Sequence, residues 1–458
     1  MFYRGDFVHT EELSNIEIFR DYLLAIDSAG YISHFENAST LLSRSLLSKE
    51  SEDRIVLIPP GSFLLPTFCD LHLHAPQFLY QGTGLHLPLM EWLNEYAFKA
   101  EERLDQDPNL AKRVYTRLGE RLVENGTGAV SLFGTIKEET NLILAETMQQ
   151  IGIRAFVGKL SMDISTRPTY IESTHSESLA SVRSFIDRTR ALTAHLPDHA
   201  RLIEPVLTPR FVPTCSDALL QGLGELAQQT GVMVQSHLAE AKDQVKAVRE
   251  TRGTSDLEVF ERAQLLTSRT IQAHCTYLSS EEFSRLARHG TAIAHCPLSN
   301  AYFSARQLAL REALNRGICV GLGTDIAGGY SVDVMTAMRW AVGVARISDG
   351  ARLDRIEGDA TEPGDKTAVN TRGLGVDWKE ALYLGTRGGA VALGLGSGVF
   401  KIGVPFDAQQ KGTGPLDFFD IGHESVDLSP EMIEKWWCVG DIRNRTGMWI
   451  QGRQILFR

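Results

Sequence analysis

The sequence predicts an α/β protein, namely a (β/α)8 TIM-like barrel with a small β-sandwich domain built from both termini. Two observations predict this fold class. Short β-branched runs alternate with amphipathic segments through the middle of the 458-residue chain, and eight such runs are present, which is the number of strands that closes a barrel. Both ends of the chain instead show short alternating runs broken by Gly, Asp and Asn, as expected for a separate β structure.

The predicted barrel strands are short apolar runs, and the segments between them have helical periodicity. The segment Leu110–Leu122 repeats Leu or Val every four residues after the helix start signal Asp107-Pro108, and Leu179–Leu192 carries a similar apolar face. The eight predicted strands are Phe63–Asp70, Ala129–Phe133, Arg154–Leu160, Leu202–Leu207, Val232–Ser236, Thr270–Ala273, Ala292–Ala294 and Cys319–Leu322.

The change of pattern places the expected domain boundaries. We expect residues 65–399 to form the barrel, and residues 1–64 together with 400–458 to form the small β-sandwich. The predicted strands of the sandwich are Tyr22–Ile26, Ile55–Ile58 and Met448–Ile455.

The end of the barrel region contains an expected loop and an expected helix. Residues 350–372 are polar and unpatterned, which predicts a surface loop. A helix is predicted to begin at Asp377, because Glu380 follows three residues later and completes a capping box, and to end near Gly394.

Composition and charge exclude several classes of protein. With 43% hydrophobic and 22% charged residues, the chain has a globular composition, and no apolar run approaches the ~18 residues that span a bilayer. A formal net charge of −11 repels phosphate backbones, so no nucleic-acid partner is expected. The N-terminus lacks the apolar core of a signal peptide. The six cysteines are scattered without a C-x-x-C pair, so we expect free thiols in a reducing cytoplasm.

Side chains that bind metals lie at or just past the C-terminal ends of four predicted strands, the barrel face where active sites are assembled. Alternate residues of a strand share a side, so both imidazoles of the first strand's H-x-H pair are predicted to face the barrel mouth. The same alternation predicts that Leu71 and Leu73 face outward. The residues are His72 and His74 after the first strand, His237 and Glu240 after the fifth, His274 after the sixth and Asp325 after the eighth.

Three histidines and one carboxylate at one rim match the donor set of zinc, with a position left open for water. Taken alone, each residue has a structural alternative: Asp325 fits a helix N-cap, and His237 fits a buried core histidine. The coincidence of four strand ends at one rim favours a metal site.

A metal would make the deprotonation of water feasible. Free water has a pKa of about 15.7, so a carboxylate near 4.3 such as Glu240 faces a gap of roughly 11 units, or about 15 kcal/mol. Zinc lowers the pKa of bound water to about 7, which reduces the gap to roughly 3 units and about 4 kcal/mol. We therefore expect Glu240 to act beside a metal.

A series of motifs between about residues 60 and 410 resembles the amidohydrolase superfamily and, within it, the guanine deaminase family. The metal-binding positions match many amidohydrolases, whereas the segments around Gln77, Trp92 and Arg210 narrow the resemblance to guanine deaminases. The departures are Leu298 in the His-Cys-Pro segment and Val404, where a Lys is common. The motifs are His72-Leu-His74-Ala-Pro-Gln77-Phe78, Leu87-Pro-Leu-Met-Glu-Trp92-Leu, Ala97-Phe-Lys-Ala-Glu-Glu102-Arg, Phe156-Val-Gly-Lys159 with Met162-Asp163, Thr208-Pro-Arg210-Phe211, Gln235-Ser-His237-Leu-Ala-Glu240, His274-Cys-Thr-Tyr-Leu-Ser279, Ala294-His-Cys-Pro-Leu-Ser-Asn300 and Gly321-Leu-Gly-Thr-Asp325-Ile-Ala-Gly-Gly329.

The resemblance implies a cytoplasmic, homodimeric hydrolase that converts guanine to xanthine and ammonia in purine catabolism. It implies one zinc ion per subunit and leaves iron open as the metal. Glu240 would shuttle protons, His274 would polarise the carbon under attack, and Asp325 would take a proton from the attacking water. Arg210 would read the guanine O6, which adenine lacks. The implied metal ligands are His72, His74, His237 and Asp325, and the implied substrate-binding residues are Gln77, Trp92, Arg210, Phe211, His237, Glu240 and Asp325.

Two alternatives stay open at this point. One is another amidohydrolase that acts on a triazine, a pterin or 8-oxoguanine, which substrate assays would distinguish. The other is a metal-free scaffold protein, which the intact ligand set and Glu240 argue against and which metal analysis would test. His295, after the seventh predicted strand, is either a structural residue of the rim or a support for the metal ligands.

Overall fold

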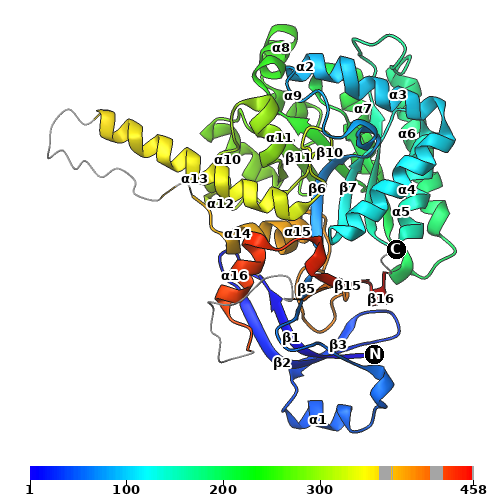
Figure 1. Ribbon diagram of the computed structural model, residues 1–458. Helices are drawn as coiled ribbons and strands as arrows, with labels where there is room; N and C mark the ends of the chain where they lie inside the picture. The colour runs from blue at the N-terminus through cyan, green and yellow to red at the C-terminus, as the bar shows by residue number, and fades with distance from the viewer. Residues whose placement is uncertain (360–372, 374, 413–426, 456–458) are drawn as a thin grey trace.

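The computed structural model describes residues 1–359, 373, 375–412 and 427–455. Figure 1 shows a larger part, in which helices enclose strands, and a sheet below it that contains the N-terminal strands. This arrangement confirms the predicted fold class, because an eight-stranded barrel is joined to a second sheet assembled from both ends of the chain.

A parallel sheet of eight strands, hydrogen-bonded in chain order, forms the barrel. The last strand meets the first through backbone hydrogen bonds: the Asp325 amide donates to the His72 carbonyl at 2.8 Å, and the His74 amide donates to the Ile326 carbonyl at 3.0 Å. The strands are β6 (Phe68–His74), β7 (Thr127–Phe133), β8 (Arg154–Ser161), β9 (Ile203–Pro209), β10 (Met233–Leu238), β11 (Thr270–His274), β12 (Ala292–His295) and β13 (Val320–Leu322).

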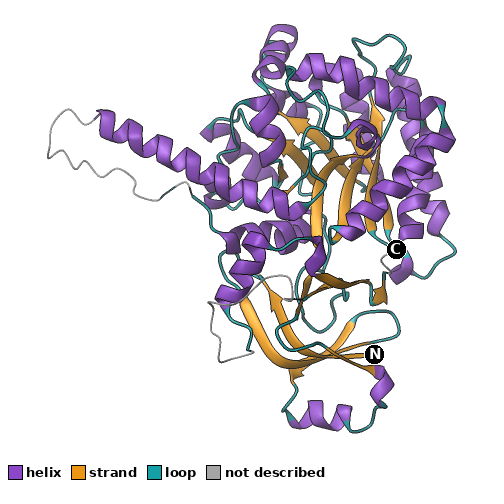
Figure 2. Ribbon diagram, viewed as in Figure 1, coloured by secondary structure: helices purple, strands orange, loops and turns teal. Residues whose placement is uncertain are grey.

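Amphipathic helices surround the barrel strands (Figure 2). The predicted helix Leu110–Leu122 is observed as α4 (Pro108–Glu124), and the Asp107 side chain caps it by accepting a hydrogen bond from the Leu110 amide at 2.9 Å. The other helices are α1 (Leu41–Leu47), α2 (Leu89–Trp92), α3 (Phe98–Gln106), α5 (Glu138–Ile151), α6 (His175–Thr193), α7 (Asp217–Thr230), α8 (Lys242–Arg252), α9 (Asp256–Arg262), α10 (Ser280–His289), α11 (Pro297–Ser299), α12 (Leu310–Asn315), α13 (Val334–Asp359), α14 (Trp378–Tyr383), α15 (Gly389–Ala392) and α16 (Pro430–Val439).

Two sequence predictions need correction. The predicted strand Phe63–Asp70 is two strands, because β5 (Phe63–Pro66) belongs to the terminal sheet and the chain then enters the barrel as β6. Both strands are buried, so the apolar run gives no sign of the crossing. The expected loop 350–372 is wrong for its first ten residues, where α13 continues to Asp359 and projects beyond the barrel wall (Figure 1). Residues 360–372 lie outside the described part of the chain.

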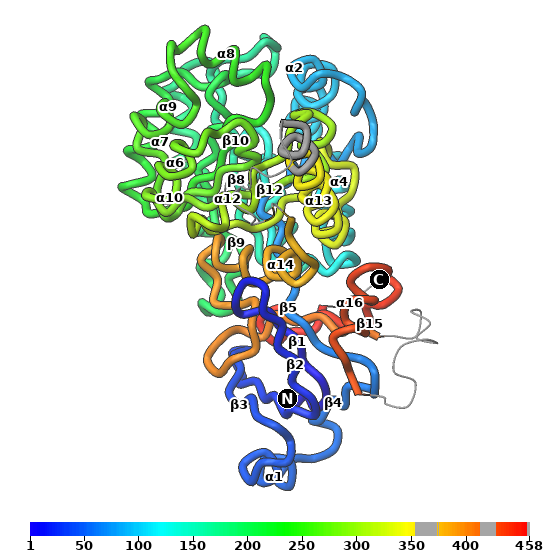
Figure 3. The backbone as a smooth tube through the Cα atoms, turned by 90° about the vertical axis from the view of Figure 1, so that its left-hand side faces the viewer, coloured from blue at the N-terminus to red at the C-terminus, as the bar shows by residue number. Residues whose placement is uncertain are grey.

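The terminal sheet combines strands from both ends of the chain, and it curls. In the order β16-β15-β14-β5-β1-β2-β3, a flat sheet would separate β1 from β15 by three spacings, about 14 Å. The Tyr3 and Trp449 rings nevertheless lie 5.4 Å apart, within a shared aromatic core. Figure 3 shows the blue N-terminal strands and the red segment that contains β15 in the same lower part of the molecule. We retain the division at residues 64/65 and 399/400 as a proposal. The strands are β1 (Phe2–His9), β2 (Glu17–Ile26), β3 (Ile32–Asn37), β4 (Ile55–Leu57), β5, β14 (Ala408–Lys411), β15 (Arg445–Ile450) and β16 (Arg453–Gln454).

A buried ion pair connects the two parts. Arg154, at the start of β8, donates to the carboxylate of Asp407 at 2.6 Å, and Asp407 lies immediately before β14.

All six cysteines are free thiols, as the sequence predicted. Among the described residues, none of the helices combines the length and apolarity that crossing a membrane requires.

Candidate active site

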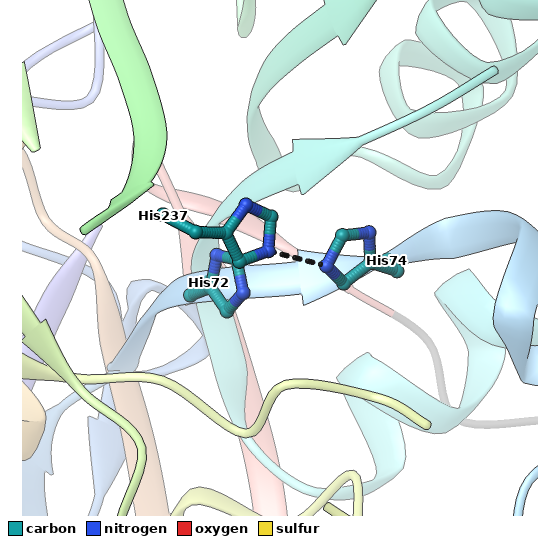
Figure 4. Close-up of side chains that lie close together, drawn as sticks. All are labelled: His72, His74 and His237. Carbon is teal, nitrogen blue, oxygen red and sulfur yellow. Dashed lines mark hydrogen bonds between the residues drawn. The ribbon is translucent and has the colours of Figure 1, made fainter. Parts of the chain in front are cut away.

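The four predicted metal ligands converge at the C-terminal ends of the barrel strands. Figure 4 shows the three imidazoles turned toward one another, although His72 and His74 come from β6 and His237 comes from β10. The Nε2 atoms of His74 and His237 lie 3.0 Å apart. One Asp325 carboxylate oxygen lies 3.2 Å from the His72 Nε2 and 3.6 Å from the His74 Nε2.

These separations fit a tetrahedral metal site. Zinc bonds of about 2.0–2.1 Å place tetrahedral ligand atoms about 3.3–3.4 Å from one another, and the three observed distances bracket that value. The His72 Nε2 is buried and has no hydrogen-bond partner. The three imidazoles lie close enough together to share one ion, and Asp325 approaches two of them, so this donor set is suited to a zinc-like divalent ion.

The histidines present lone pairs, as metal binding requires. Burial, as the largest cause, lowers the pKa of His72, His74 and His237 well below the usual histidine value, so the neutral rings are favoured. The His237 Nδ1 lies 2.6 Å from the Arg210 carbonyl. Because a carbonyl only accepts, Nδ1 carries the proton and Nε2 carries the lone pair.

Leu71 departs from the predicted orientation. Leu73 packs among helix residues outside the barrel, as predicted, but Leu71 joins a cluster drawn from strands around the whole barrel, including Ala129 of β7 and Ala294 of β12. Residues from such distant strands meet only in the barrel interior. The cause is an irregularity between Asp70 and Leu73, where the pairing with β7 shifts register. The simple alternation of inward and outward side chains along β6 therefore fails at Leu71, one residue before the ligand His72.

Asp70 ties the first and last strands together beside the ligands. Its carboxylate accepts hydrogen bonds from the His72 amide and from the amide and hydroxyl of Thr324. Asp325 itself has a φ of 50°, a left-handed conformation that non-glycine residues rarely adopt. Strained residues of this kind cluster at functional sites, where surrounding contacts hold them. Sequence reasoning missed Asp70, although its position two residues before His72 is a usable signal.

Glu240 and His274 form a second acid–base pair next to the ligands. The His274 Nε2 lies 3.6 Å from a Glu240 carboxylate oxygen and 3.8 Å from Asp325. Burial, reinforced by the Asp325 charge, raises the pKa of Glu240 well above its usual value, so the protonated carboxyl group is favoured more than in an exposed glutamate. The Asn300 side-chain oxygen lies 2.9 Å from the His274 Nδ1 and fixes the proton there, which leaves Nε2 of the neutral ring as an acceptor.

One pocket collects every residue that the resemblance assigned to the substrate. Sequence reasoning missed part of its wall, the apolar side chains of Leu89, Leu93 and Phe303, because apolar residues on short helices do not differ in pattern from core residues. The predicted residues that line this pocket are Gln77, Trp92, Arg210, Phe211, His237, Glu240 and Asp325.

The two predicted hydrogen-bonding residues of the pocket share a partner that the sequence analysis did not identify. Arg210 donates to a Glu101 carboxylate oxygen at 2.5 Å, and the Gln77 amide nitrogen donates to the other at 3.1 Å. Glu101 is fully buried in α3. Glu101 lies three residues from both Phe98 and Leu104, which places a carboxylate on the apolar face of the helix. This position could have indicated from the sequence that the carboxylate has a buried partner.

His295 contributes no ligand atom to this cluster. It is buried at the end of β12, neither ring nitrogen has a hydrogen-bond partner, and burial lowers its pKa to about 3. Its side chain borders a groove along α13 instead of the substrate pocket. Leu298 is buried and does not line the substrate pocket, so this departure from the family pattern leaves the pocket wall unchanged.

Comparison with known proteins identifies the family to which the chain belongs. The amidohydrolase family model matches residues 63–411. Guanine deaminase of Mus musculus is 35% identical, covering 99% of this chain and 96% of its own, and that of Dictyostelium discoideum is 33% identical, covering 99% and 98%. A guanine deaminase structure from C. acetobutylicum, with guanine bound in its active site, has a TM-score of 0.85 at 28% identity and 99% coverage of both chains. The chain therefore belongs to the amidohydrolase family, in its guanine deaminase branch.

Proposed function

We propose that the protein is a metal-dependent hydrolase that converts guanine to xanthine and ammonia. The observation that carries this proposal is the single pocket in which Arg210, Gln77 and Glu240 stand beside the cluster of three histidines and Asp325. The full-length similarity to guanine deaminases supports guanine as the substrate.

The proposed metal site consists of His72, His74, His237 and Asp325. A divalent ion held there, for which we propose zinc, supplies a Lewis acid and lowers the pKa of water to about 7. The chain keeps the ligands neutral and oriented, because burial disfavours protonated imidazole and the Arg210 carbonyl holds the His237 ring by its Nδ1 proton.

Glu240 is the proposed proton shuttle. Its raised pKa favours the protonated carboxyl group, which is the form that can give a proton to a ring nitrogen of guanine. Protonation of the ring makes C2 more electrophilic, and Asp325 would accept a proton from the attacking water. Glu240, now ionised, would take the proton of the new C2 hydroxyl and give it to the departing amine, so that ammonia leaves and the C2 carbonyl forms. The proton taken up by Asp325 would then restore Glu240 to its protonated form.

We propose that His274, which forms a pair with Glu240, assists the attack of water on the substrate. With Nδ1–H held by Asn300, the neutral ring can accept at Nε2 the proton that Asp325 takes from the attacking water. Only the protonated ring donates a hydrogen bond from Nε2, which would go to the oxygen bonded to the carbon under attack, so the polarising role requires this transfer first. The buried position makes the charged state transient.

Arg210 is the proposed reader of the base. Its guanidinium stays protonated near neutral pH and can only donate hydrogen bonds. Guanine presents a carbonyl oxygen at C6, where adenine presents an amino group. Adenine would leave without an acceptor those donors of the buried guanidinium that Glu101 does not engage, which is costly. Phe211 and Trp92 are proposed to cover the faces of the purine.

The test is a steady-state assay of ammonia release by the purified, metal-loaded protein with guanine, adenine, 8-oxoguanine, pterin and the triazine ammeline. We expect guanine to be preferred and to yield one xanthine for each ammonia. Absence of ammonia from guanine would refute the proposal, and a preference for ammeline or pterin would assign another amidohydrolase activity.

We further propose that the enzyme acts in purine catabolism, in the cytoplasm and as a homodimer with one zinc ion per subunit. The free thiols support a reducing compartment, and the dimer rests on family resemblance alone. Fractionation of cells and light scattering of the purified protein test the location and the oligomeric state. A secreted protein or a monomer would contradict these proposals without affecting the proposed reaction.

A further inference from the structure

Glu101 is a buried carboxylate at which two residues of the substrate pocket meet. It lies in the middle of α3, is fully buried, and engages both of its oxygens. One oxygen accepts from Arg210 Nη1 at 2.5 Å, and the other accepts from Gln77 Nε2 at 3.1 Å. Gln77 lies in the turn that follows β6, and Arg210 directly follows β9. Glu101 therefore joins two segments that are far apart in the sequence.

Each partner is also held from a second side. The Gln77 side-chain oxygen accepts a hydrogen bond from the Ala327 amide at 3.1 Å, which fixes which end of the amide faces Glu101. The Arg210 guanidinium lies over the Phe98 ring at 4.9 Å, one helical turn before Glu101 on the same helix. Glu101 therefore holds both Arg210 and Gln77 in position, although it is not itself one of the residues that line the pocket.

Glu101 also offsets the charge of Arg210. Arg210 is 2% exposed and remains positively charged, and its ion pair with Glu101 offsets that charge. The part of the pocket formed by Arg210 and Gln77 thus offers directed hydrogen bonds without an unpaired cationic group.

We propose that Glu101 is a positioning and specificity-determining residue that orients Arg210 and Gln77 and offsets the charge of the Arg210 guanidinium, so that the site selects a neutral purine over a purine anion. This inference rests on the proposed function. Xanthine loses a ring proton more readily than guanine or hypoxanthine, so a pocket in which the guanidinium charge is offset binds the substrate better than the ionised product. Selection against the anion favours release of the product.

The test uses the full-length, metal-loaded protein and two non-reacting probes, hypoxanthine and xanthine, whose dissociation constants are measured by calorimetry. In mildly acidic buffer both probes are neutral, whereas in mildly alkaline buffer xanthine is the more extensively ionised. For Glu101→Gln, we expect hypoxanthine to bind at least about tenfold more weakly. The affinity for xanthine relative to hypoxanthine should rise at least about fivefold in alkaline buffer and stay unchanged in acidic buffer.

Matched variants separate this role from a structural one. Glu102→Gln removes the neighbouring carboxylate, which pairs with Arg167 at 2.5 Å outside the pocket, and should leave both affinities within about twofold. Glu101→Asp keeps the charge and should retain the wild-type ratio of affinities. Arg210→Gln leaves Glu101 as an uncompensated anion and should lower the ratio, so it tests the charge argument even if Glu101→Gln fails to fold.

An unchanged affinity ratio in folded Glu101→Gln would overturn the proposal, as would an equal change in Glu102→Gln or an unlowered ratio in Arg210→Gln. The failure of the proposed function has a different signature, because it appears in the wild-type protein as absence of ammonia release from guanine. Binding of the two probes does not depend on turnover. The two failures are therefore distinguishable.

Discussion

The Nε2 atoms of His74 and His237 lie 3.0 Å apart, although 163 residues separate the two positions in the chain. His237 directs a lone pair into this contact, because its other ring nitrogen gives its proton to the Arg210 carbonyl. Burial disfavours protonation of both rings. A divalent cation between them, shared with His72 and Asp325, is the arrangement that uses these lone pairs.

Removal of the metal should abolish activity and lower stability together. A ligand that binds only the folded state stabilises it by about 4 kcal/mol when its free concentration is a thousand times its dissociation constant. We therefore expect a chelator to eliminate ammonia release and to lower the midpoint of thermal unfolding by several degrees. Calorimetry before and after zinc is restored measures the effect, and an unchanged midpoint would contradict a metal held by these four residues.

Glu240→Gln should separate metal binding from proton transfer. Glutamine fills the same space but neither gives nor accepts the proton, so kcat should fall at least about a hundredfold. The metal content should stay at the wild-type value, because Glu240 is not among the proposed ligands. Elemental analysis provides the control, and near-normal turnover by the loaded variant would remove Glu240 from the mechanism.

Arg210→Ala should impair recognition of guanine without loss of the metal. The His237 ring is held by the Arg210 backbone carbonyl, which the substitution retains. Each lost hydrogen bond to the base should reduce kcat/KM for guanine at least about tenfold, or roughly 1.4 kcal/mol. Competition between guanine and adenine measures the selectivity, and an unchanged preference would show that O6 is read by another residue.

Asp256 should make stability depend on pH. It is buried at the start of α9, and burial raises its pKa to about 6. Its protonated form is favoured in the folded state, so its contribution to stability is present at low pH and is lost as the pH rises through about 6. Between about pH 5 and about pH 8, this loss amounts to about 1.4 kcal/mol for an unfolded value near 3.8.

Asp256→Asn should remove this dependence, because the amide is neutral and its oxygen still accepts from Gln244, which donates to Asp256 at 2.8 Å. Urea denaturation of both proteins at the two pH values gives the difference directly. The variant should gain about 1.4 kcal/mol on the wild type from the lower to the higher pH. A difference that does not change with pH would mean that this carboxyl group ionises normally.

Strand ends were the part of the site that the sequence could predict. A parallel barrel delivers the C-terminal ends of its strands to one rim, so a histidine or aspartate at such an end is placed by topology alone. His72, His74, His237 and Asp325 converge for this reason, even though the limits of individual strands differ from the predicted ones by up to five residues.

Other features depend on contacts that periodicity does not encode. The register shift that turns Leu71 inward arises from pairing with β7. The length of α13 was missed because Gly350 and the polar residues after it are typical of loops. Glu101 was missed because its significance comes from Arg210, which is 109 positions away in the chain and adjacent only in the folded protein.

Zinc titration of the metal-free protein, with bound metal and ammonia release from guanine recorded in the same samples, tests the central claim most directly. We expect both quantities to rise in parallel and to reach a plateau at one zinc per chain, with no ammonia released before zinc is added. Full activity of metal-free protein, or a protein that binds zinc and leaves guanine intact, would contradict a metal-dependent guanine deaminase.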